Sequence, residues 1–307
     1  MPASIQLVIF SRDRADFLKK TLDSALKQDY SEITYEIIIS DNSEGDDVSE
    51  LINASYLNYK NITYIKRNPP TSSLKHFEIV ISEITSEYVV MFHDDDILHP
   101  KYIKKISPYI LKNNNIAVGC NASIFKNNIN DTNKTMHSFR SVKEFKNKKS
   151  FLEQYLLGNG GIAPFPGYIY KTFFLKKVSS NLTVLGKHSD VMLVSSLLNY
   201  GSIVWLPDSL MYYRVHKGSD SAKENIPDRL KLLRFMYLEG VSKYSESVFL
   251  YRFLYWINWI RQQGPFFENF PSWRYRIAIK FILYNLLRVF LSKYFFNLIL
   301  KKIKLIH

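Results

Sequence analysis

The chain has 307 residues, of which 46% are hydrophobic and 15% aromatic, so it is long enough for one large domain or for a domain with an appendage. This composition excludes a globally disordered chain, because it supplies enough apolar side chains for a buried core. The 41 Lys and Arg residues against 28 Asp and Glu give a net charge of +13, which indicates an anionic partner: nucleotide phosphates, nucleic acid or an acidic membrane face.

Four short apolar runs in the first third of the chain alternate with stretches of helical periodicity. Strands are predicted at residues 5–10, 35–40, 62–66 and 88–92. Helices are predicted from about 17 to 26, from 46 to 54, and from a cap at Thr71–Ser73 to about Thr85. Such alternation implies right-handed crossovers and therefore an α/β fold with a mainly parallel sheet that carries helices on both faces.

Each of these four strands ends in polar residues. Ser11–Arg14 follow the first strand, Asp41–Ser43 the second, Arg67–Asn68 the third and Asp94–Asp96 the fourth. Ligands of open α/β sheets bind at the carboxyl ends of the strands. We therefore expect these residues to face one crevice, and the first third of the chain to bind a nucleotide.

The turn after the first strand contains no glycine. Ser11–Arg14 therefore lacks the dinucleotide-binding fingerprint, and no Walker-A sequence is present, which argues against a nicotinamide enzyme or a P-loop ATPase. Three adjacent carboxylates, Asp94–Asp96, repel one another unless a cation lies among them, and their hard oxygen atoms suit Mg²⁺ or Mn²⁺. The alternative is an acidic turn that caps the helix expected from Lys101.

Beyond residue 100 the pattern is less regular. A polar surface excursion is expected at 126–149, and the Gly- and Pro-rich stretch at 158–167 either lines a cleft or only connects two elements. The remaining predicted elements are a strand at 116–124, a helix at 151–157, a helix that begins at Asp190, and two short strands at 203–207 and 210–215.

Four motifs, in their order and spacing, resemble the family-2 glycosyltransferases, the large inverting group with the GT-A fold. They are Val8–Arg14, Ile37–Ser43, the DXD-like Phe92–Pro100, and Tyr213–His216 with its Tyr-Arg-x-His pattern. The resemblance covers roughly residues 4–221. It implies a GT-A fold with a C-terminal helical extension, and transfer of a sugar from a nucleotide sugar to a glycan or lipid-linked acceptor in bacterial surface-polysaccharide synthesis, of the capsule, O-antigen or lipopolysaccharide type.

The resemblance also divides the chain. Residues 1–225 would form the catalytic domain, with a nucleotide-binding half at 1–100 and an acceptor-binding half at 101–225. Residues 226–307 would form the helical C-terminal region.

Within the nucleotide-binding half, the resemblance assigns Asp41 to the nucleobase. Arg67 and Lys75 would lie near the base or the diphosphate, although either is equally compatible with a solvated charge. UDP is the default nucleotide by resemblance, with dTDP and GDP as alternatives. The full set implied to bind the nucleotide sugar is Phe10, Ser11, Arg12, Arg14, Asp41, Arg67, Lys75, Asp94 and Asp95.

The acidic segment departs from the two-aspartate spacing of the family. If Ile97–Pro100 sets the register, His93 occupies the first acidic position and Asp95 the second. Asp95 is then the preferred ligand, Asp94 would reach the ribose or the metal through water, and Asp96 would join the metal site or orient its neighbours. The metal ligands implied for Mn²⁺ or Mg²⁺ are Asp95, Asp96 and His216, with Arg214, Ser219 and Ser221 of the late motif near the diphosphate.

An inverting transfer needs one carboxylate to deprotonate the acceptor hydroxyl as it attacks. The family places this aspartate after a glutamate at the start of a helix. Here Ser189 stands in place of the glutamate and Asp190 is the candidate base. The alternative is an aspartate that only caps the helix.

The C-terminal region is aromatic and basic, and no acidic residue occurs from Asn269 onward. Such helices can lie in the interface of an anionic membrane, or they can form a helical pair packed on the catalytic domain. No apolar run reaches the roughly 20 residues that a spanning helix needs. No nucleic-acid reader motif is present, so a nucleic-acid partner is not expected.

We expect a cytoplasmic protein at the cytoplasmic face of the inner membrane. The strand pattern begins at Ile5, which leaves no room for a signal peptide, and the single cysteine, Cys120, is typical of a reducing compartment. Two other functions remain as alternatives. A nucleotidyltransferase would share the α/β sheet and the acidic metal site but needs a glycine-rich phosphate loop, and a non-catalytic glycan- or membrane-binding protein would retain only the fold.

Overall fold

The structure is a computed structural model that describes residues 3–30, 33–111, 115–126, 128–131, 134–138, 140–157, 165–179, 186–216 and 226–262. Its elements are, in chain order, β1 (Ser4–Ser11), α1 (Ala15–Ala25), β2 (Thr34–Asp41), α2 (Asp47–Ser55), β3 (Ile62–Lys66), α3 (Ser73–Glu83), β4 (Tyr88–His93), β5 (Ile97–Leu98), α4 (Tyr102–Leu111), β6 (Asn115–Phe125), the short 3₁₀ turn η1 (Ile129–Asp131), β7 (Lys134–Thr135), β8 (Lys143–Phe145), α5 (Lys148–Leu156), the 3₁₀ turn η2 (Phe165–Gly167), β9 (Ile169–Lys171), α6 (Thr172–Ser179), the 3₁₀ turn η4 (Gly186–His188), α7 (Ser189–Leu197), β10 (Ser202–Arg214), α8 (Ile226–Leu238) and α9 (Glu246–Gln262).

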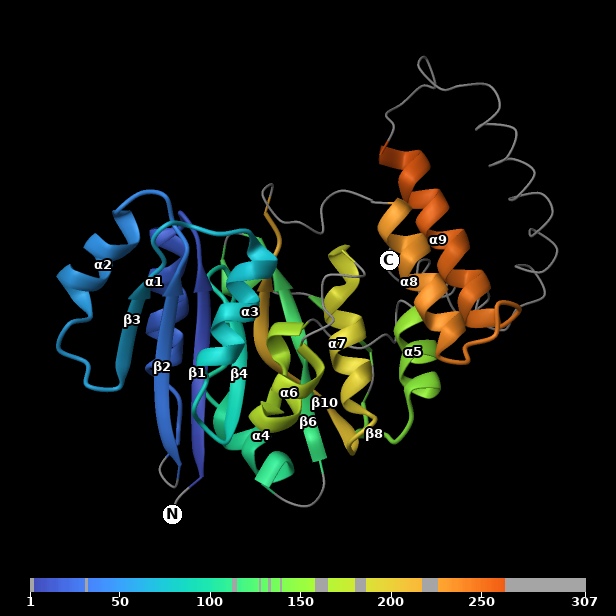
Figure 1. Ribbon diagram of the computed structural model, residues 1–307, viewed down its shortest axis with the longest axis horizontal. Coiled ribbons are helices and arrows are strands. Elements are labelled where there is room, and N and C mark those ends of the chain that lie inside the picture. The colour runs from blue at the N-terminus through green and yellow to red at the C-terminus, as the bar shows by residue number, and fades with distance from the viewer. Residues whose placement is uncertain are drawn as a thin grey trace.

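The strands form one ten-stranded sheet with the order β3-β2-β1-β4-β9-β6-β10-β5, to which β7 and β8 add at β6 and β10. Strands β1 to β4 are parallel. β9 is antiparallel to both β4 and β6, and β10 is parallel to β6, so β6 and β10 point the same way as β1 to β4. The carboxyl ends of six strands therefore meet at one edge (Figure 1), and the predicted mainly parallel α/β sheet is confirmed.

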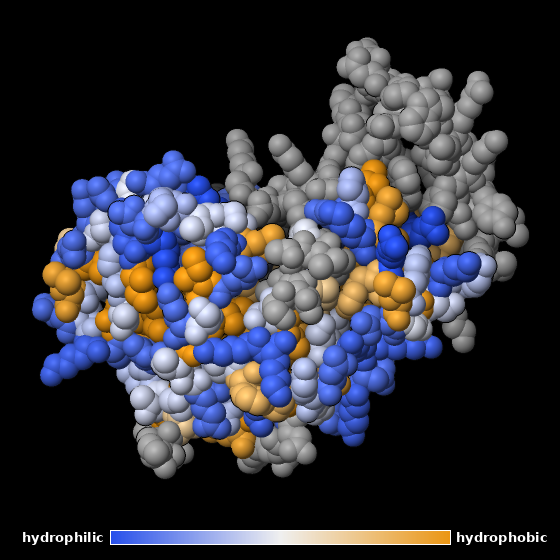
Figure 2. Space-filling view, viewed as in Figure 1, coloured by the Kyte–Doolittle hydropathy of each residue, from blue (hydrophilic) through white to orange (hydrophobic). Residues whose placement is uncertain are grey.

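Hydrophobic side chains cover both faces of the sheet. Along β1, Ile5, Leu7 and Ile9 pack in one cluster with residues of α1, α2 and α4, while Val8 packs in a second cluster with residues of α3 and α5 to α7. A strand covered on both faces needs apolar residues at successive positions, which explains the uninterrupted apolar run. In the view of Figure 2, hydrophilic residues (blue) cover much of the face, and hydrophobic ones (orange) show between them, over α3 and its neighbouring strands.

The late strand differs from its prediction. The two short strands expected at 203–207 and 210–215 are one strand, β10, from Ser202 to Arg214. Its pairing with β6 shifts register between Leu206 and Ser209, around Pro207. Proline has no N–H to donate to a ladder and is confined to edges and irregular places in a sheet. The predicted break after Pro207 is therefore wrong, because the strand accommodates the proline as an irregularity in its pairing and continues to Arg214.

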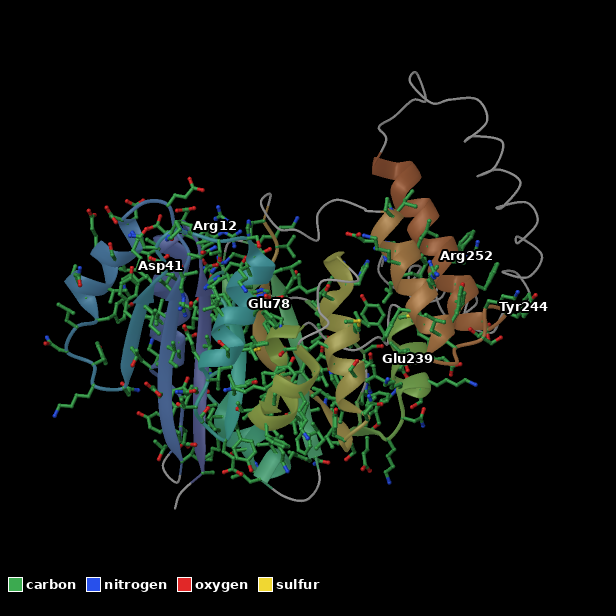
Figure 3. All side chains as sticks on the ribbon, in the orientation of Figure 1. Arg12, Asp41, Glu78, Glu239, Tyr244 and Arg252 are labelled. Carbon is green, nitrogen blue, oxygen red and sulfur yellow. The ribbon has the colours of Figure 1, made fainter. Side chains whose placement is uncertain are left out.

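Helices α8 and α9 pack on the rest of the protein. Leu232, Leu233 and Val248 belong to the same hydrophobic cluster as residues of α5 and α7, and Lys148 of α5 forms an ion pair with Glu239 at 2.9 Å. Figure 3 shows Glu239, Tyr244 and Arg252 on this side of the molecule. The basic segment from residue 269 onward lies outside the described residues. Within the residues that are described, no helix is both long and apolar enough to cross a membrane.

Replacing Gly119 by alanine is expected to destabilise the sheet at its centre. An added Cβ would come within 2.5 Å of Cζ in the ring of Tyr168, which is only 1% exposed and cannot move aside easily. Overpacking of this kind costs about 1–3 kcal/mol. We expect a melting temperature several degrees lower by differential scanning calorimetry. Gly45→Ala is the control, because nothing lies within 4 Å of its added Cβ, and equal melting temperatures for the two variants would contradict this packing.

Candidate active site

A pocket of about 330 Å³ opens at the edge where β1, β4 and β10 end. It gathers residues from the first turn, the start of α3, the acidic segment and the late motif. The residues that line it are Phe10, Ser11, Arg12, Arg14, Asn42, Ser73, His76, Phe77, His93, Asp94, Asp95, Tyr213 and Arg214. Seven of these carried a predicted role, namely Phe10, Ser11, Arg12, Arg14, Asp94, Asp95 and Arg214.

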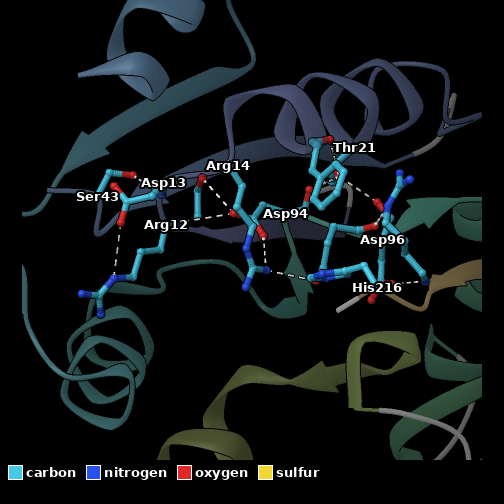
Figure 4. A network of polar contacts seen from close by, with 12 residues as sticks. Arg12, Asp13, Arg14, Thr21, Ser43, Asp94, Asp96 and His216 are labelled. Atoms are coloured by element: carbon cyan, nitrogen blue, oxygen red, sulfur yellow. Dashed lines mark hydrogen bonds and ion pairs between the residues drawn. The ribbon is translucent and has the colours of Figure 1, made fainter. Parts of the chain in front are cut away.

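Asp94 connects the end of β4 to the turn after β1. Its carboxylate accepts hydrogen bonds from Ser11 Oγ at 3.1 Å and from the Arg12 backbone N–H at 3.0 Å, and Arg14 Nη1 lies 3.3 Å from its other oxygen (Figure 4). Burial raises the pKa of Asp94 to about 6, against the lowering effect of these donors. Asp94 therefore holds the glycine-free turn in place, in addition to any contact it makes with a ligand.

Asp13 explains how this turn forms without glycine. Its φ of 52° lies in the left-handed region, which aspartate tolerates better than most residues because its short side chain bonds locally. The Asp13 backbone N–H donates to Ser43 Oγ at 2.7 Å, and Asp13 Oδ1 accepts from the Glu44 N–H at 3.0 Å (Figure 4). These bonds fix the turn against the end of β2.

His93, Asp95 and Asp96 form a group that can hold a metal ion. One ligand atom from each lies within 4.8 Å of the others. Asp96 Oδ1 accepts from the Arg214 backbone N–H at 3.0 Å, whereas Asp96 Oδ2 is buried and has no hydrogen-bond partner among the described residues. Burial, followed by the charge of Asp95, raises the pKa of Asp96 well above its usual value. Because a buried carboxylate oxygen without a partner is costly, this donor set fits a divalent cation.

His93 was not predicted as a ligand. The register of the acidic segment placed it at the first acidic position, but the predicted set contained Asp95, Asp96 and His216. In the structure His216 Nε2 lies 2.9 Å from Asp95 Oδ2, and Arg14 Nη1 lies 3.0 Å from the same oxygen. His216 is thus a direct neighbour of the group. The sequence did contain a signal that His93 could be a metal ligand, because this histidine stands at a position that the family fills with a carboxylate.

Two further residues position the acidic segment. Thr21 Oγ1, on α1, lies 2.8 Å from the backbone oxygen of Asp94 and 2.7 Å from that of Asp96. Arg214 Nε donates to the backbone oxygen of Asp95 at 2.7 Å, and its guanidinium lies over the ring of Phe17, 4.5 Å from the centroid. The sequence pattern showed Thr21 only as one residue of an amphipathic helix.

The predicted base-binding residue is enclosed by its own chain. Asp41, at the end of β2, is 0% exposed. Its Oδ1 accepts from the Ser43 N–H at 2.9 Å and its Oδ2 from the Tyr64 hydroxyl at 2.7 Å. Figure 3 shows it at the same edge of the sheet as Arg12. Among the described residues, Asn42 rather than Asp41 lines the pocket, and base binding by Asp41 stays a prediction.

Arg67 and Lys75 are also outside the set of lining residues among the described parts of the chain. Two nitrogens of Arg67 lie 2.8 and 2.6 Å from the carboxylate oxygens of Glu83. Lys75 is solvent-exposed and pairs with Glu78 at 3.4 Å. These ion pairs do not test whether Arg67 and Lys75 contact the nucleotide, so that role stays a prediction. Ser219 and Ser221 lie outside the described residues.

Asp190 occupies the first turn of α7. Its Oδ1 accepts from the Val191 N–H at 2.9 Å, and burial raises its pKa to about 6. Helix α7 leads into the start of β10, so its own start lies toward the edge where the strands end (Figure 1). Asp190 is not among the described residues that line the pocket. The start of α7 is therefore near the same edge, and the role of Asp190 as the base stays a prediction.

Comparisons with known proteins agree with this arrangement. No match was found among curated proteins. Similar solved structures include S. aureus TarS in complex with UDP-GlcNAc, with a TM-score of 0.59, 16% identity, and coverage of 85% of this chain and 72% of that chain. Another is the mannosyltransferase PcManGT from Pyrobaculum calidifontis in complex with GDP-Man and Mn²⁺, with a TM-score of 0.51, 12% identity, and coverage of 96% and 84%. At these identities the likeness establishes the fold, which is the GT-A fold.

The sequence profile described as "Glycosyl transferase family 2" matches residues 6–178, which include the turn after β1, the end of β2 and the acidic segment. Because this match spans more than half of the 307 residues, the chain belongs to glycosyl transferase family 2.

Proposed function

We propose that this protein is an inverting, metal-dependent glycosyltransferase that transfers a sugar from a nucleotide sugar, in the first place a UDP-sugar, to a glycan or lipid-linked acceptor during surface-polysaccharide synthesis. The observation that carries the proposal is the pocket at the strand ends, which His93 and Asp95 line, together with the neighbouring Asp96, whose buried Oδ2 has no hydrogen-bond partner among the described residues. Arginine side chains and carboxylates thus meet where a nucleoside diphosphate binds in an open α/β sheet.

His93, Asp95 and Asp96 would hold a divalent cation, Mn²⁺ or Mg²⁺, with His216 beside them. Bound there, the cation supplies positive charge that offsets the charge developing on the departing nucleoside diphosphate. Imidazole nitrogen suits Mn²⁺ better than Mg²⁺, which prefers oxygen ligands in near-ideal octahedral geometry. The donor set therefore favours Mn²⁺.

The chain's own residues supply the remaining functions. Arg14, whose side chain is 38% exposed, and Arg214 provide positive charge for the phosphates. Phe10 and Phe77 stack with ring centroids 5.6 Å apart and give the pocket an apolar wall for a nucleobase. Asp190 would accept the proton of the acceptor hydroxyl as that oxygen attacks the anomeric carbon, and the configuration of the sugar inverts because the leaving group departs from the opposite side.

The complexes formed by structural neighbours support this donor class. Solved structures show S. aureus TarS in complex with UDP-GlcNAc and with UDP, and PcManGT in complex with GDP-Man and Mn²⁺. For the acceptor, the basic and aromatic sequence of residues 269–307 supports peripheral contact with anionic lipid at the cytoplasmic face of the inner membrane. A lipid-linked acceptor would be presented at that surface.

The proposal is tested first by binding. Full-length protein is titrated with UDP, dTDP, GDP and CDP, each with and without Mn²⁺, by isothermal titration calorimetry. We expect at least one nucleoside diphosphate to bind, with an affinity that Mn²⁺ raises by about tenfold or more. A protein that binds none of them at millimolar concentration, with or without metal, would contradict the proposal.

Product analysis then separates the alternatives. A glycosyltransferase releases nucleoside diphosphate from the nucleotide sugar, and proton NMR of the product shows an inverted anomeric centre. A nucleotidyltransferase would release pyrophosphate from a nucleoside triphosphate instead. A non-catalytic binding protein would bind the nucleotide or glycan with no turnover of any donor.

A further inference from the structure

His76 is a buried polar side chain in the wall of the pocket to which no predicted role is assigned. It lies in the first turn of α3, is 5% exposed and lines the pocket. Its ring meets the ring of Phe10 edge to face, with the centroids 5.3 Å apart, and Phe10 in turn stacks on Phe77. A polar ring is thus held beside the apolar wall that suits a nucleobase.

A chain of buried contacts holds His76 from behind. His76 Nε2 lies 2.7 Å from Ser40 Oγ, and Ser40 is 0% exposed. Ser40 Oγ accepts a hydrogen bond from Arg67 Nε at 2.9 Å. Glu83 holds the guanidinium of Arg67 through two further contacts of 2.8 and 2.6 Å. The four side chains form a line that ends at the pocket.

The direction of these hydrogen bonds follows from the chemistry of arginine. A guanidinium can only donate, so Ser40 Oγ accepts from Arg67 and must place its own hydrogen elsewhere. Among the described residues its one other side-chain partner is His76 Nε2. Nε2 is then the acceptor. Burial, followed by the charge of Arg67, lowers the pKa of His76 to about 4, so the ring is neutral at pH 7. A neutral imidazole with an accepting Nε2 carries its hydrogen on Nδ1.

We propose that His76 selects the nucleobase of the donor, by donating a hydrogen bond from Nδ1 to a keto oxygen of a base that packs beside Phe10. Nδ1 has no hydrogen-bond partner among the described residues, and the ring lines the pocket. The inference rests on the proposed nucleotide-sugar activity and deepens it. The keto oxygen meant is O4 of a pyrimidine or O6 of a purine, so uracil, thymine and guanine should bind better than cytosine and adenine, which carry an amino group at that position.

Calorimetry with UDP and CDP, in the presence of Mn²⁺, tests the selection on the full-length chain. The two ligands share ribose and diphosphate and differ at position 4 of the base. Wild type should prefer UDP by about tenfold or more, because a site that donates to a keto oxygen leaves donors unpaired against an amino group. His76→Phe should weaken UDP binding by about tenfold and bring the ratio of the two affinities close to one.

Ser40→Ala tests whether the tautomer of His76, and not only the presence of its ring, selects the base. It keeps His76 but removes the hydroxyl that fixes its tautomer, so Nδ1 can then accept from the amino group of cytosine. The preference for UDP over CDP should fall several-fold, mainly through tighter binding of CDP. Glu78→Gln, on the exposed side of the same helix (Figure 3), is the control and should leave the ratio unchanged.

A spectroscopic readout is independent of nucleotide binding. A long-range ¹H–¹⁵N correlation spectrum of the wild-type protein should show His76 with a protonated Nδ1 and an unprotonated Nε2. A protonated Nε2, or a ratio of UDP to CDP affinity that neither His76→Phe nor Ser40→Ala changes, overturns the assignment while the glycosyltransferase proposal stands. A wild-type protein that binds no nucleoside diphosphate overturns both.

Discussion

Asp190→Asn is expected to reduce sugar transfer by a factor on the order of 10² to 10⁴, the usual contribution of a positioned general base. Asparagine has the shape of aspartate but cannot take up the proton of the acceptor hydroxyl. Asp190 is not among the described residues that line the nucleotide-side pocket, so nucleotide affinity should stay within about twofold. The measurements are turnover of the donor and calorimetry with UDP and Mn²⁺.

The raised pKa of Asp190 adds a pH dependence. The carboxyl acts as a base only when it is ionised, and burial raises its pKa to about 6. Transfer by the wild type should therefore be constant above pH 7 and fall as the pH drops through about 6. The residual activity of Asp190→Asn should show a smaller step, because Asp94, whose pKa is also raised to about 6, still titrates in this range.

The free energy of unfolding should change with pH in the opposite direction to the rate of sugar transfer. A folded-state pKa above the usual 3.8 means that the folded protein holds the proton more tightly than the unfolded chain, so ionised Asp190 costs stability as the pH rises from about 4 to 6. Asp190→Asn removes this cost and should melt at the same temperature as wild type or higher at pH 8. Asp208→Asn is the control, because Asp208 pairs with Lys105 on the surface and should affect neither property. Unchanged turnover in Asp190→Asn would eliminate it as the base.

Asp96→Asn is expected to weaken the binding of Mn²⁺ by about 100-fold or more, since even residues that only support metal ligands contribute 10- to 100-fold, and to remove most of the effect of the metal on nucleotide affinity. The amide oxygen can still accept from the Arg214 N–H, as Asp96 Oδ1 does at 3.0 Å. What is lost is the negative charge on the buried oxygen that has no partner among the described residues. The readouts are Mn²⁺ titration by electron paramagnetic resonance, without nucleotide, and calorimetry with UDP.

The metal-free variant should be at least as stable as metal-free wild type, because a buried carboxylate whose pKa is raised costs free energy when it ionises. Glu44→Gln is the matched control. It removes one negative charge from an exposed residue at the same edge, where Glu44 pairs with Arg12. If Asp96→Asn and Glu44→Gln bind Mn²⁺ equally well, the ion is not held by this group.

The parts of the site that follow directly after strands could be predicted from the sequence. The parallel sheet and the meeting of Ser11–Arg14 with the acidic segment follow from apolar runs that end in polar residues, because parallel strands bring their carboxyl ends to one edge. Arg214, more than a hundred residues later, was reached by motif resemblance, and the structure places it in the same pocket.

The parts that depend on packing across the sheet could not be predicted. Thr21 and His76 lie inside helices whose pattern shows only which face is apolar, and their roles come from contacts with the acidic segment after β4 and with β2. The enclosure of Asp41 by Tyr64 depends in the same way on the register of β2 and β3. The continuous strand β10 was missed because a proline in sequence does not reveal that a neighbouring strand shifts register to match it.

One carboxylate oxygen has an arginine and a histidine neighbour that lie far apart in the sequence. Arg14 and His216 both contact Asp95 Oδ2, at 3.0 and 2.9 Å. An ion that coordinates this oxygen competes with both contacts, so the net affinity of the site for the ion is reduced by the cost of weakening them. Arg14 would keep its contact with Asp94 Oδ1 while its guanidinium becomes more available to the phosphates beside it. Metal and nucleotide should consequently reinforce each other's binding.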